Sequence, residues 1–187
     1  MTNPFDLKDR VVFITGIAKG IGAKTAEMLA EAGAIIEAGD IDAKGAEATA
    51  SRIAKSGGRI GVHALDVRED AQWQAAMAAV KAMHGKLDGL VNNAGIIMMK
   101  PLSMTTLEDW RRVNGINVEG TFLGCKHAQP LLAAGAKARG GWASIVNLSS
   151  VYGYTAAANF SAYCASRRSA SIRRIPVPST PTSAPGR

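Results

Sequence analysis

The sequence lacks several features that mark particular classes of protein. It has only two cysteines, Cys125 and Cys164, and their spacing fits neither a disulfide framework nor a metal site. No apolar run reaches the roughly 18 residues that a membrane span needs, and residues 1–9 carry no signal-peptide pattern. We therefore expect a cytoplasmic protein that holds no metal and does not act with a membrane.

Acidic residues are missing from Cys164 to the end of the chain. Five of the 22 Lys and Arg residues lie in this stretch, so it contributes +5 of the net charge of +7 and the upstream part contributes only +2. Four of the seven prolines fall in the final twelve residues. The 187 residues suffice for one domain, and we expect an incomplete domain over 1–166 followed by a basic, disordered tail over 167–187.

Two explanations of this tail remain open. A shift of reading frame near codon 167 of a GC-rich gene would produce an abrupt change to Arg, Ser, Pro and Ala. A selected basic arm that binds nucleic acid or an anionic surface is the alternative. The tail has no aromatic residue and no nucleic-acid-binding pattern precedes it, which favours the frameshift and predicts no nucleic-acid partner.

The amino-terminal part has the order of a strand, a glycine loop and a helix. Residues 11–15 are apolar, the run Gly16-Ile17-Ala18-Lys19-Gly20-Ile21-Gly22 follows, and strong helix formers over 23–32 end at Gly33. A phosphate binds at such a point, because unpaired N–H groups and the positive end of the helix dipole meet there. Alone the loop is a weak signal, since a glycine-rich turn that only packs a helix on a strand has the same pattern.

A second expected strand over 34–39 ends at Asp40, about twenty residues beyond the loop, where a ribose-binding carboxylate is expected. A carboxylate there accepts hydrogen bonds from the ribose hydroxyls and repels a 2′-phosphate, so Asp40 favours NAD over NADP. Lys19 favours the opposite choice, because a cation in the loop could pair with that phosphate, but we give Asp40 more weight. Glu37 is unexpected in a strand that should be buried on both faces.

Strands and helices continue to alternate along the chain. Further strands are expected at 60–65, 87–91 and 144–148, and helices at 70–83, 106–113 and 117–134, the last containing Pro130. This alternation predicts right-handed βαβ units and hence an α/β fold: a doubly wound, Rossmann-type parallel sheet in three α/β/α layers, incomplete at the carboxyl end. The scattered histidines His63, His84 and His127 are expected to be structural or solvated.

Seven motifs in order make the chain resemble the short-chain dehydrogenase/reductase family: the Thr15-Gly16-x-x-x-Gly20-x-Gly22 loop, Asp40, Asp66-Val67, Asn92-Asn93-Ala94-Gly95, Asn117, Ser149-Ser150 and Tyr163. The resemblance implies a seven-stranded parallel sheet, and intact relatives commonly form homo-oligomers through long helices. It assigns the pyrophosphate to Gly16, Lys19, Gly20, Ile21 and Gly22, the ribose to Asp40 and the adenine to Asp66 and Val67. It also places Asn93, Ala94 and Gly95 under the cofactor, and Asn117, Ser150 and Tyr163 at the chemistry.

Tyr163 is the candidate acid/base, because hydride transfer at an alcohol carbon requires a proton to leave or reach the oxygen. A free phenol has a pKa near 10 and needs a nearby cation. One positive charge at about 4 Å is worth roughly 4 kcal/mol at an effective dielectric of 20, or about 3 pKa units. Ser150 would orient the substrate oxygen, with Ser149 as a structural neighbour, and Asn117 would interrupt its helix and hold water for a proton relay.

Arg167 stands where the family pattern Tyr-x-x-x-Lys has lysine. The resemblance implies that this lysine lowers the tyrosine pKa and binds the nicotinamide ribose, and a planar guanidinium does not reproduce a compact ammonium. The sequence therefore predicts an NAD(P)-dependent oxidoreductase with a small alcohol or carbonyl substrate and lowered turnover. A nucleotide-binding fragment without turnover is the alternative, and a basic-armed binding protein is third.

Overall fold

Five short strands form a parallel sheet in the computed structural model, which describes residues 6–168. In chain order they are β1 (Val11–Thr15), β2 (Ile35–Asp40), β3 (Arg59–Ala64), β4 (Gly89–Asn92) and β5 (Ser144–Asn147). Their order across the sheet is β3-β2-β1-β4-β5, and every neighbouring pair is parallel. The direction of winding therefore reverses between β1 and β4, and such a switch point opens a crevice at the carboxyl ends of the strands.

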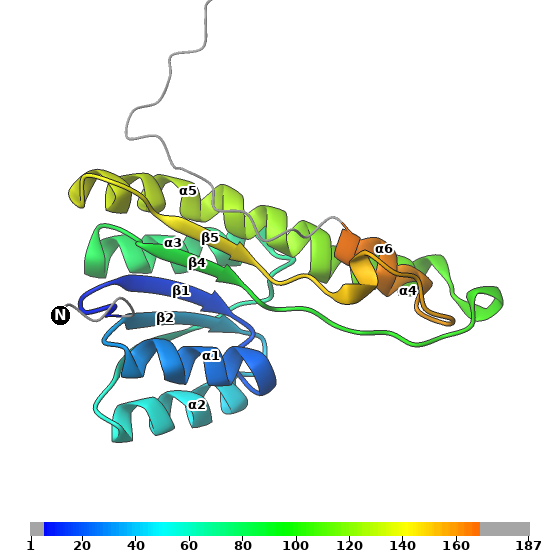
Figure 1. The fold of residues 1–187 in the computed structure, drawn as a ribbon, viewed down its shortest axis with the longest axis horizontal. Coiled ribbons are helices and arrows are strands. Elements are labelled where there is room, and N and C mark those ends of the chain that lie inside the picture. Colours follow the sequence, from blue (N-terminus) through cyan, green and yellow to red (C-terminus); the bar gives the residue numbers. More distant parts are fainter. Residues whose placement is uncertain (1–5, 169–187) are drawn as a thin grey trace, which may run out of the picture.

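Helices cover both faces of the sheet, as the sequence predicted (Figure 1). On one face lie α1 (Gly20–Glu31) and α2 (Ala43–Lys55), and on the other lie α3 (Asp70–His84) and α5 (Gly120–Ala138). Because side chains alternate along a strand, β1 supplies both cores: Val12 and Ile14 pack with α1 and α2, whereas Val11 and Phe13 pack with α3 and α5.

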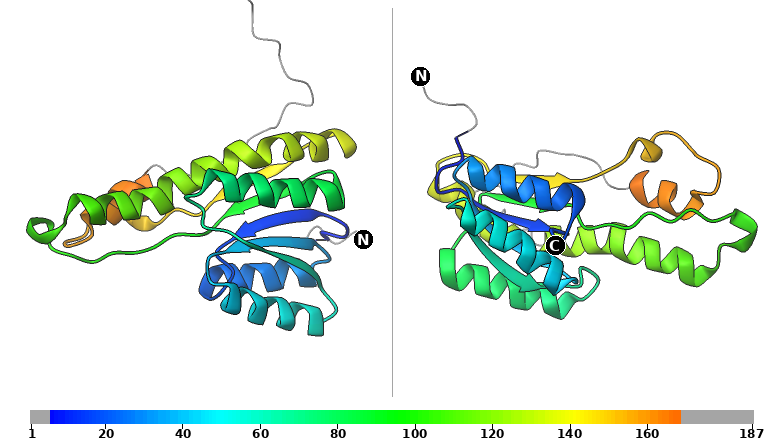
Figure 2. Two further views of the ribbon diagram at one scale, coloured as in Figure 1. Left: turned by 180° about the vertical axis from the view of Figure 1, so that it is seen from behind. Right: turned by 90° about the horizontal axis from the view of Figure 1, so that it is seen from below.

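The remaining helices lie beyond the carboxyl ends of the strands, beside the first half of α5 (Figures 1 and 2). They are α4 (Leu107–Asn114), α6 (Ser161–Arg168) and the single turns η1 (Leu102–Met104) and η3 (Val151–Gly153). The widened turn η2 (Gly115–Glu119) joins α4 to α5. None of the helices over 6–168 is both long and apolar enough to cross a membrane.

Several expected boundaries were wrong. Helix α1 begins at Gly20 rather than at 23, because the last glycines of the loop already form its first turn. The helix expected at 117–134 begins at Gly120 after η2 and continues to Ala138, so Pro130 lies well inside it. Arg167 and Arg168, assigned to the tail, belong to α6, whereas the rest of the expected tail lies outside the described residues.

A polar cluster accounts for Glu37. The side chain is 2% exposed, and its two carboxylate oxygens meet His63 Nε2 at 2.6 Å and His84 Nε2 at 2.7 Å. Burial raises the pKa of Glu37, but the hydrogen bonds from the two histidines outweigh it and hold the pKa below its ordinary value. The cluster thus joins β2, β3 and the end of α3. Within 6–168, no group of three or more His, Cys, Asp or Glu residues could hold a metal ion.

Candidate active site

A cavity of about 530 Å³ lies at the carboxyl ends of the strands, at the switch point between β1 and β4. Loops that follow all five strands contribute to its wall, and two residues of α6 also line it. Its lining includes Gly16, Ala18, Lys19, Ile21, Gly22, Asp40, Asp42, Asp66, Val67, Arg68, Asn93, Ala94, Gly95, Ile96, Leu148, Ser149, Tyr163 and Arg167.

The glycine loop is shaped by two close approaches of the backbone. Gly16 has a φ of +77°, which favours glycine. A Cβ on Gly22 would lie 2.0 Å from Gly16 O and 2.4 Å from Asn93 Nδ2, so no larger residue fits there. The N-cap residue of α1, Lys19, makes no side-chain cap hydrogen bond, which leaves the N–H groups of the first turn free of a cap. A phosphate fits this cradle.

Asn93 fixes the glycine loop to the end of β4. Its Nδ2 donates to Thr15 O at 2.8 Å and to Gly16 O at 2.9 Å. The buried hydroxyl of Thr15 accepts in return from Asn93 N at 3.1 Å and Ala94 N at 3.0 Å. Asn93 therefore positions the loop through the amide of its own side chain, and Thr15, which sequence reasoning gave no role, is its partner.

Asp40 stands at the edge of the cavity at the end of β2. One carboxylate oxygen accepts from Ala18 N at 2.8 Å, and the other accepts from Asp42 N at 2.9 Å. These contacts hold the carboxylate beside the glycine loop. Lys19 lines the same cavity and is exposed, so the two opposite charges that bear on cofactor choice are both present.

Sequence reasoning missed Arg68, although it directly follows the Asp66-Val67 motif. Arg68 Nε donates to both oxygens of Asp66, at 2.9 and 3.1 Å, and Arg68 N donates to Asp66 Oδ1 at 3.0 Å. The hydrogen bonds from Arg68 lower the pKa of Asp66, against the opposing effect of burial. Val67 is buried, and its carbonyl oxygen accepts from Trp73 Nε1 at 2.9 Å. Asp66 and Arg68 both line the cavity.

Tyr163 and Arg167 lie on α6 and line the other end of the cavity. The guanidinium carbon of Arg167 is 5.3 Å from the centroid of the Tyr163 ring. Arg167 Nη1 donates to Leu148 O at 2.8 Å, and the backbone oxygen of Arg167 accepts from Ser149 Oγ at 2.8 Å. These two bonds fix α6 to the end of β5 and set the position of Tyr163.

Three residues that the sequence placed at the site do not line the cavity: Gly20, Asn117 and Ser150. Ser150 Oγ accepts from Tyr152 N at 3.2 Å and caps η3, whereas Ser149, expected to be only a structural neighbour, lines the cavity. Asn117 is fully buried in η2. Its side chain bonds Ile96 N at 2.9 Å, Ile96 O at 3.0 Å and Ser166 Oγ at 2.9 Å. These bonds occupy the amide, and the proton relay remains a prediction.

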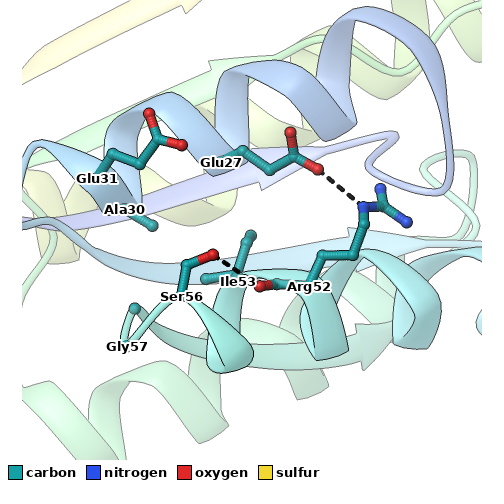
Figure 3. Close-up of a pocket in the computed structure, with 8 residues that line it drawn as sticks. Glu27, Ala30, Glu31, Arg52, Ile53, Ser56 and Gly57 are labelled. Atoms are coloured by element: carbon teal, nitrogen blue, oxygen red, sulfur yellow. Dashed lines mark hydrogen bonds and ion pairs between the residues drawn. The ribbon is translucent and has the colours of Figure 1, made fainter.

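A second cavity, of about 400 Å³, lies between α1 and α2 (Figure 3). Arg52 Nε donates to Glu27 Oε1 at 2.9 Å across it, and Ser56 Oγ donates to the backbone oxygen of Arg52 at 3.2 Å. Two of its three charged side chains, Glu27 and Arg52, are therefore already paired with each other. It lies away from the switch point, so we take the first cavity as the functional site.

Comparisons with known proteins agree with this geometry. The family model for short chain dehydrogenase matches residues 10–171. The D-threitol dehydrogenase of Mycolicibacterium smegmatis is 41% identical over 87% of this chain and 61% of its own length. The cyclopentanol dehydrogenase of a Comamonas species is 36% identical over 86% of this chain and 62% of its own.

Solved structures show the same fold. The crystal structure of a short-chain type dehydrogenase/reductase from Mycobacterium marinum superposes with a TM-score of 0.81 and 29% identity. That match covers 88% of this chain and 66% of the other. The chain thus spans between 61% and 66% of the length of these three proteins.

Proposed function

Because the chain belongs to the short-chain dehydrogenase family, we propose that it is an NAD-dependent oxidoreductase acting on a small alcohol or carbonyl compound. One observation carries this proposal: a single cavity is lined by the glycine loop, by the carboxylate of Asp40 and by the phenol of Tyr163. Within that loop, Gly22 has no room for a Cβ. No other described cavity combines an anion site with an acid/base group.

The residues fit a nicotinamide dinucleotide. Gly16, Gly22 and the first turn of α1 would hold its pyrophosphate, and Asp40 would hold the adenosine ribose. Asp66 and Val67 would lie at the adenine. When bound, the nicotinamide supplies or accepts the hydride. The carboxylate of Asp40 disfavours a 2′-phosphate, which makes NAD the proposed cofactor and leaves Lys19 as the feature that favours NADP.

Tyr163 would hold or release the proton at the substrate oxygen. Arg167 supplies positive charge beside the ring, but its guanidinium lies against the ring and its Nη1 is engaged by Leu148 O. Ser150 would contact the substrate oxygen only if η3 shifted, since Ser150 does not line the cavity. Its oxygen accepts from Tyr152 N, which leaves its O–H free to donate. The engaged guanidinium of Arg167 and the position of Ser150 away from the cavity both support slow turnover.

The test is reduction of NAD⁺ by a panel of alcohols that includes D-threitol and cyclopentanol, followed by NADH absorbance. We expect turnover with at least one alcohol, and its loss in Tyr163→Phe. Tyr154→Phe is the matched control, because Tyr154 is 99% exposed. Equal turnover of Tyr163→Phe and the unchanged chain would contradict the role of Tyr163.

A second function is favoured by Arg167 itself: a nucleotide-binding protein without turnover. A guanidinium in this position is a poor replacement for an ammonium near the reacting atoms. Saturable NADH binding by the unchanged chain with no turnover of any alcohol, and turnover that appears in Arg167→Lys, would support this second function over the first.

A further inference from the structure

Ser166 carries a buried hydroxyl that links two elements behind the site. The residue is 0% exposed and lies on α6. Its Oγ donates to Tyr163 O at 2.8 Å and accepts from Asn117 Nδ2 at 2.9 Å. A hydroxyl has one O–H to donate, so the donor of Ser166 is committed to the backbone of Tyr163. One side chain thus joins η2 to the residue that carries the phenol.

Asn117 is fixed at the other end of this link. It is fully buried, its Oδ1 accepts from Ile96 N at 2.9 Å, and its Nδ2 donates to Ile96 O at 3.0 Å. With Ser166 as the second acceptor, both N–H bonds of the amide are in use. Rotation of the amide would leave buried polar groups unpaired, which costs free energy. The contacts therefore run from the loop after β4, through η2, to α6.

Helix α6 depends on contacts of this kind because it is short. It spans only Ser161–Arg168, and helices below about 12 residues are marginal in water without tertiary packing. Ser149 and the guanidinium of Arg167 attach the carboxyl end of α6 to β5. Ser166 instead holds the backbone of Tyr163, which lies in the first turn. The two attachments together fix both ends of the helix.

We infer that Ser166 is a positioning residue for the reaction, which transfers the fixed place of Asn117 to the backbone of Tyr163; this inference rests on the proposed function. The phenol must meet the substrate oxygen at hydrogen-bond distance, and a misplacement of about 1 Å can lower the rate about a hundredfold. Ser166 does not line the cavity, so it acts on the proton transfer only through Tyr163. Asn117 acts on Tyr163 by the same route.

NMR signals of the three tyrosine rings test this inference in the full chain without cofactor or substrate. The Tyr163 ring centroid lies 6.3 Å from that of Tyr152 and 6.4 Å from that of Phe160, so ring currents make its signal sensitive to small displacements. We expect Ser166→Ala to shift the Tyr163 signal, which Tyr163→Phe assigns. Ser161→Ala is the matched control and should leave the signal in place, because Ser161 Oγ is buried on the same helix but has no hydrogen-bond partner within 6–168.

A purely structural role for Ser166 gives a different result. Ser166→Ala would then lower Tm while the Tyr163 signal stays in place, and this result would overturn the inference. An equal shift in Ser161→Ala would also overturn it. If Ser166→Ala fails to fold, Ser166→Cys replaces it, because a thiol fills similar space but is only a weak donor. A folded Ser166→Cys with an unmoved Tyr163 signal would overturn the inference.

Kinetics separate this inference from the proposed function. With an alcohol that the unchanged chain oxidises, Ser166→Ala should lower kcat at least about tenfold and leave KM within about twofold, since Ser166 acts on the transition state and does not touch the bound substrate. Equal kcat in Ser166→Ala and the unchanged chain would overturn the inference. Absence of both turnover and NADH binding in the unchanged chain would contradict only the proposed function, because the tyrosine signals report on Ser166 without either.

Discussion

The guanidinium of Arg167 lies against the Tyr163 ring, with its Cζ 5.3 Å from the ring centroid. Leu148 O holds Nη1, and burial of the whole residue restricts it to this place. The charge is therefore near the phenol, but its position is set by the end of β5 rather than by the hydroxyl of Tyr163. This relationship decides how well the site can move a proton.

Replacement of Arg167 by lysine should raise turnover. A compact ammonium on a flexible stem can reach the cavity, whereas the guanidinium is held against the ring. We expect kcat for an uncharged alcohol such as cyclopentanol to rise at least tenfold, about 1.4 kcal/mol in barrier height. Steady-state rates of NADH formation measure this, with Arg168→Lys as the control. A rate within a few-fold of the unchanged chain would refute the prediction.

Asp40→Asn should weaken the preference for NAD. The substitution keeps an acceptor for one of the two backbone N–H groups that Asp40 binds, but removes the charge that repels a 2′-phosphate. We expect the ratio of NADPH to NADH affinity to rise by about tenfold, roughly 1.4 kcal/mol. Lys19→Met should change the ratio in the opposite direction. Competitive titrations of the two cofactors measure both variants, and an unchanged ratio in Asp40→Asn would argue against a ribose role.

Glu37→Gln should destabilise the fold, because one histidine then faces an amide N–H₂ instead of an acceptor. We expect a loss of about 1–3 kcal/mol in the free energy of unfolding at pH 7. Urea unfolding measures it, with the exposed Glu31→Gln as the control. A loss in Glu31→Gln as large as in Glu37→Gln would contradict this role.

The same cluster predicts a pH dependence. The folded-state pKa of Glu37 lies below its ordinary value of 4.5, so its contribution is fully present above pH 4.5 and is lost as pH falls through the lower folded-state value. The stability difference between the unchanged chain and Glu37→Gln should therefore shrink below pH 4.5. A difference that stays constant down to pH 3 would be inconsistent with this linkage.

Local sequence patterns correctly predicted several strands and loops of the fold. The apolar run of β1, the glycine loop and Asp40 were expected at the places where the structure has them, because each depends on neighbouring residues. Helix α2 was missed, since its buried face consists mainly of small residues such as Ala46 and Ala50 between charged ones.

Contacts between distant parts of the chain could not be predicted in this way. Glu37 and His84 are 47 residues apart, and only the packing of α3 beside β2 and β3 brings them together. Ser149 and Ser150 have the same side chain, so the choice between them depends on the turn η3. The frameshift, the cytoplasmic setting and the pairing of subunits remain predictions.

Titration of the full chain with NADH, followed by fluorescence, tests the central claim most directly. We predict saturable binding at one site, an affinity at least tenfold lower in Gly22→Ala, and an unchanged affinity in Gly141→Ala. The added Cβ would lie 2.0 Å from Gly16 O in the first variant, but no closer than 3.9 Å to any neighbour in the second. Circular dichroism shows whether each variant is folded. Absence of saturable binding, or equal affinity in a folded Gly22→Ala, would contradict a nucleotide site in this cavity.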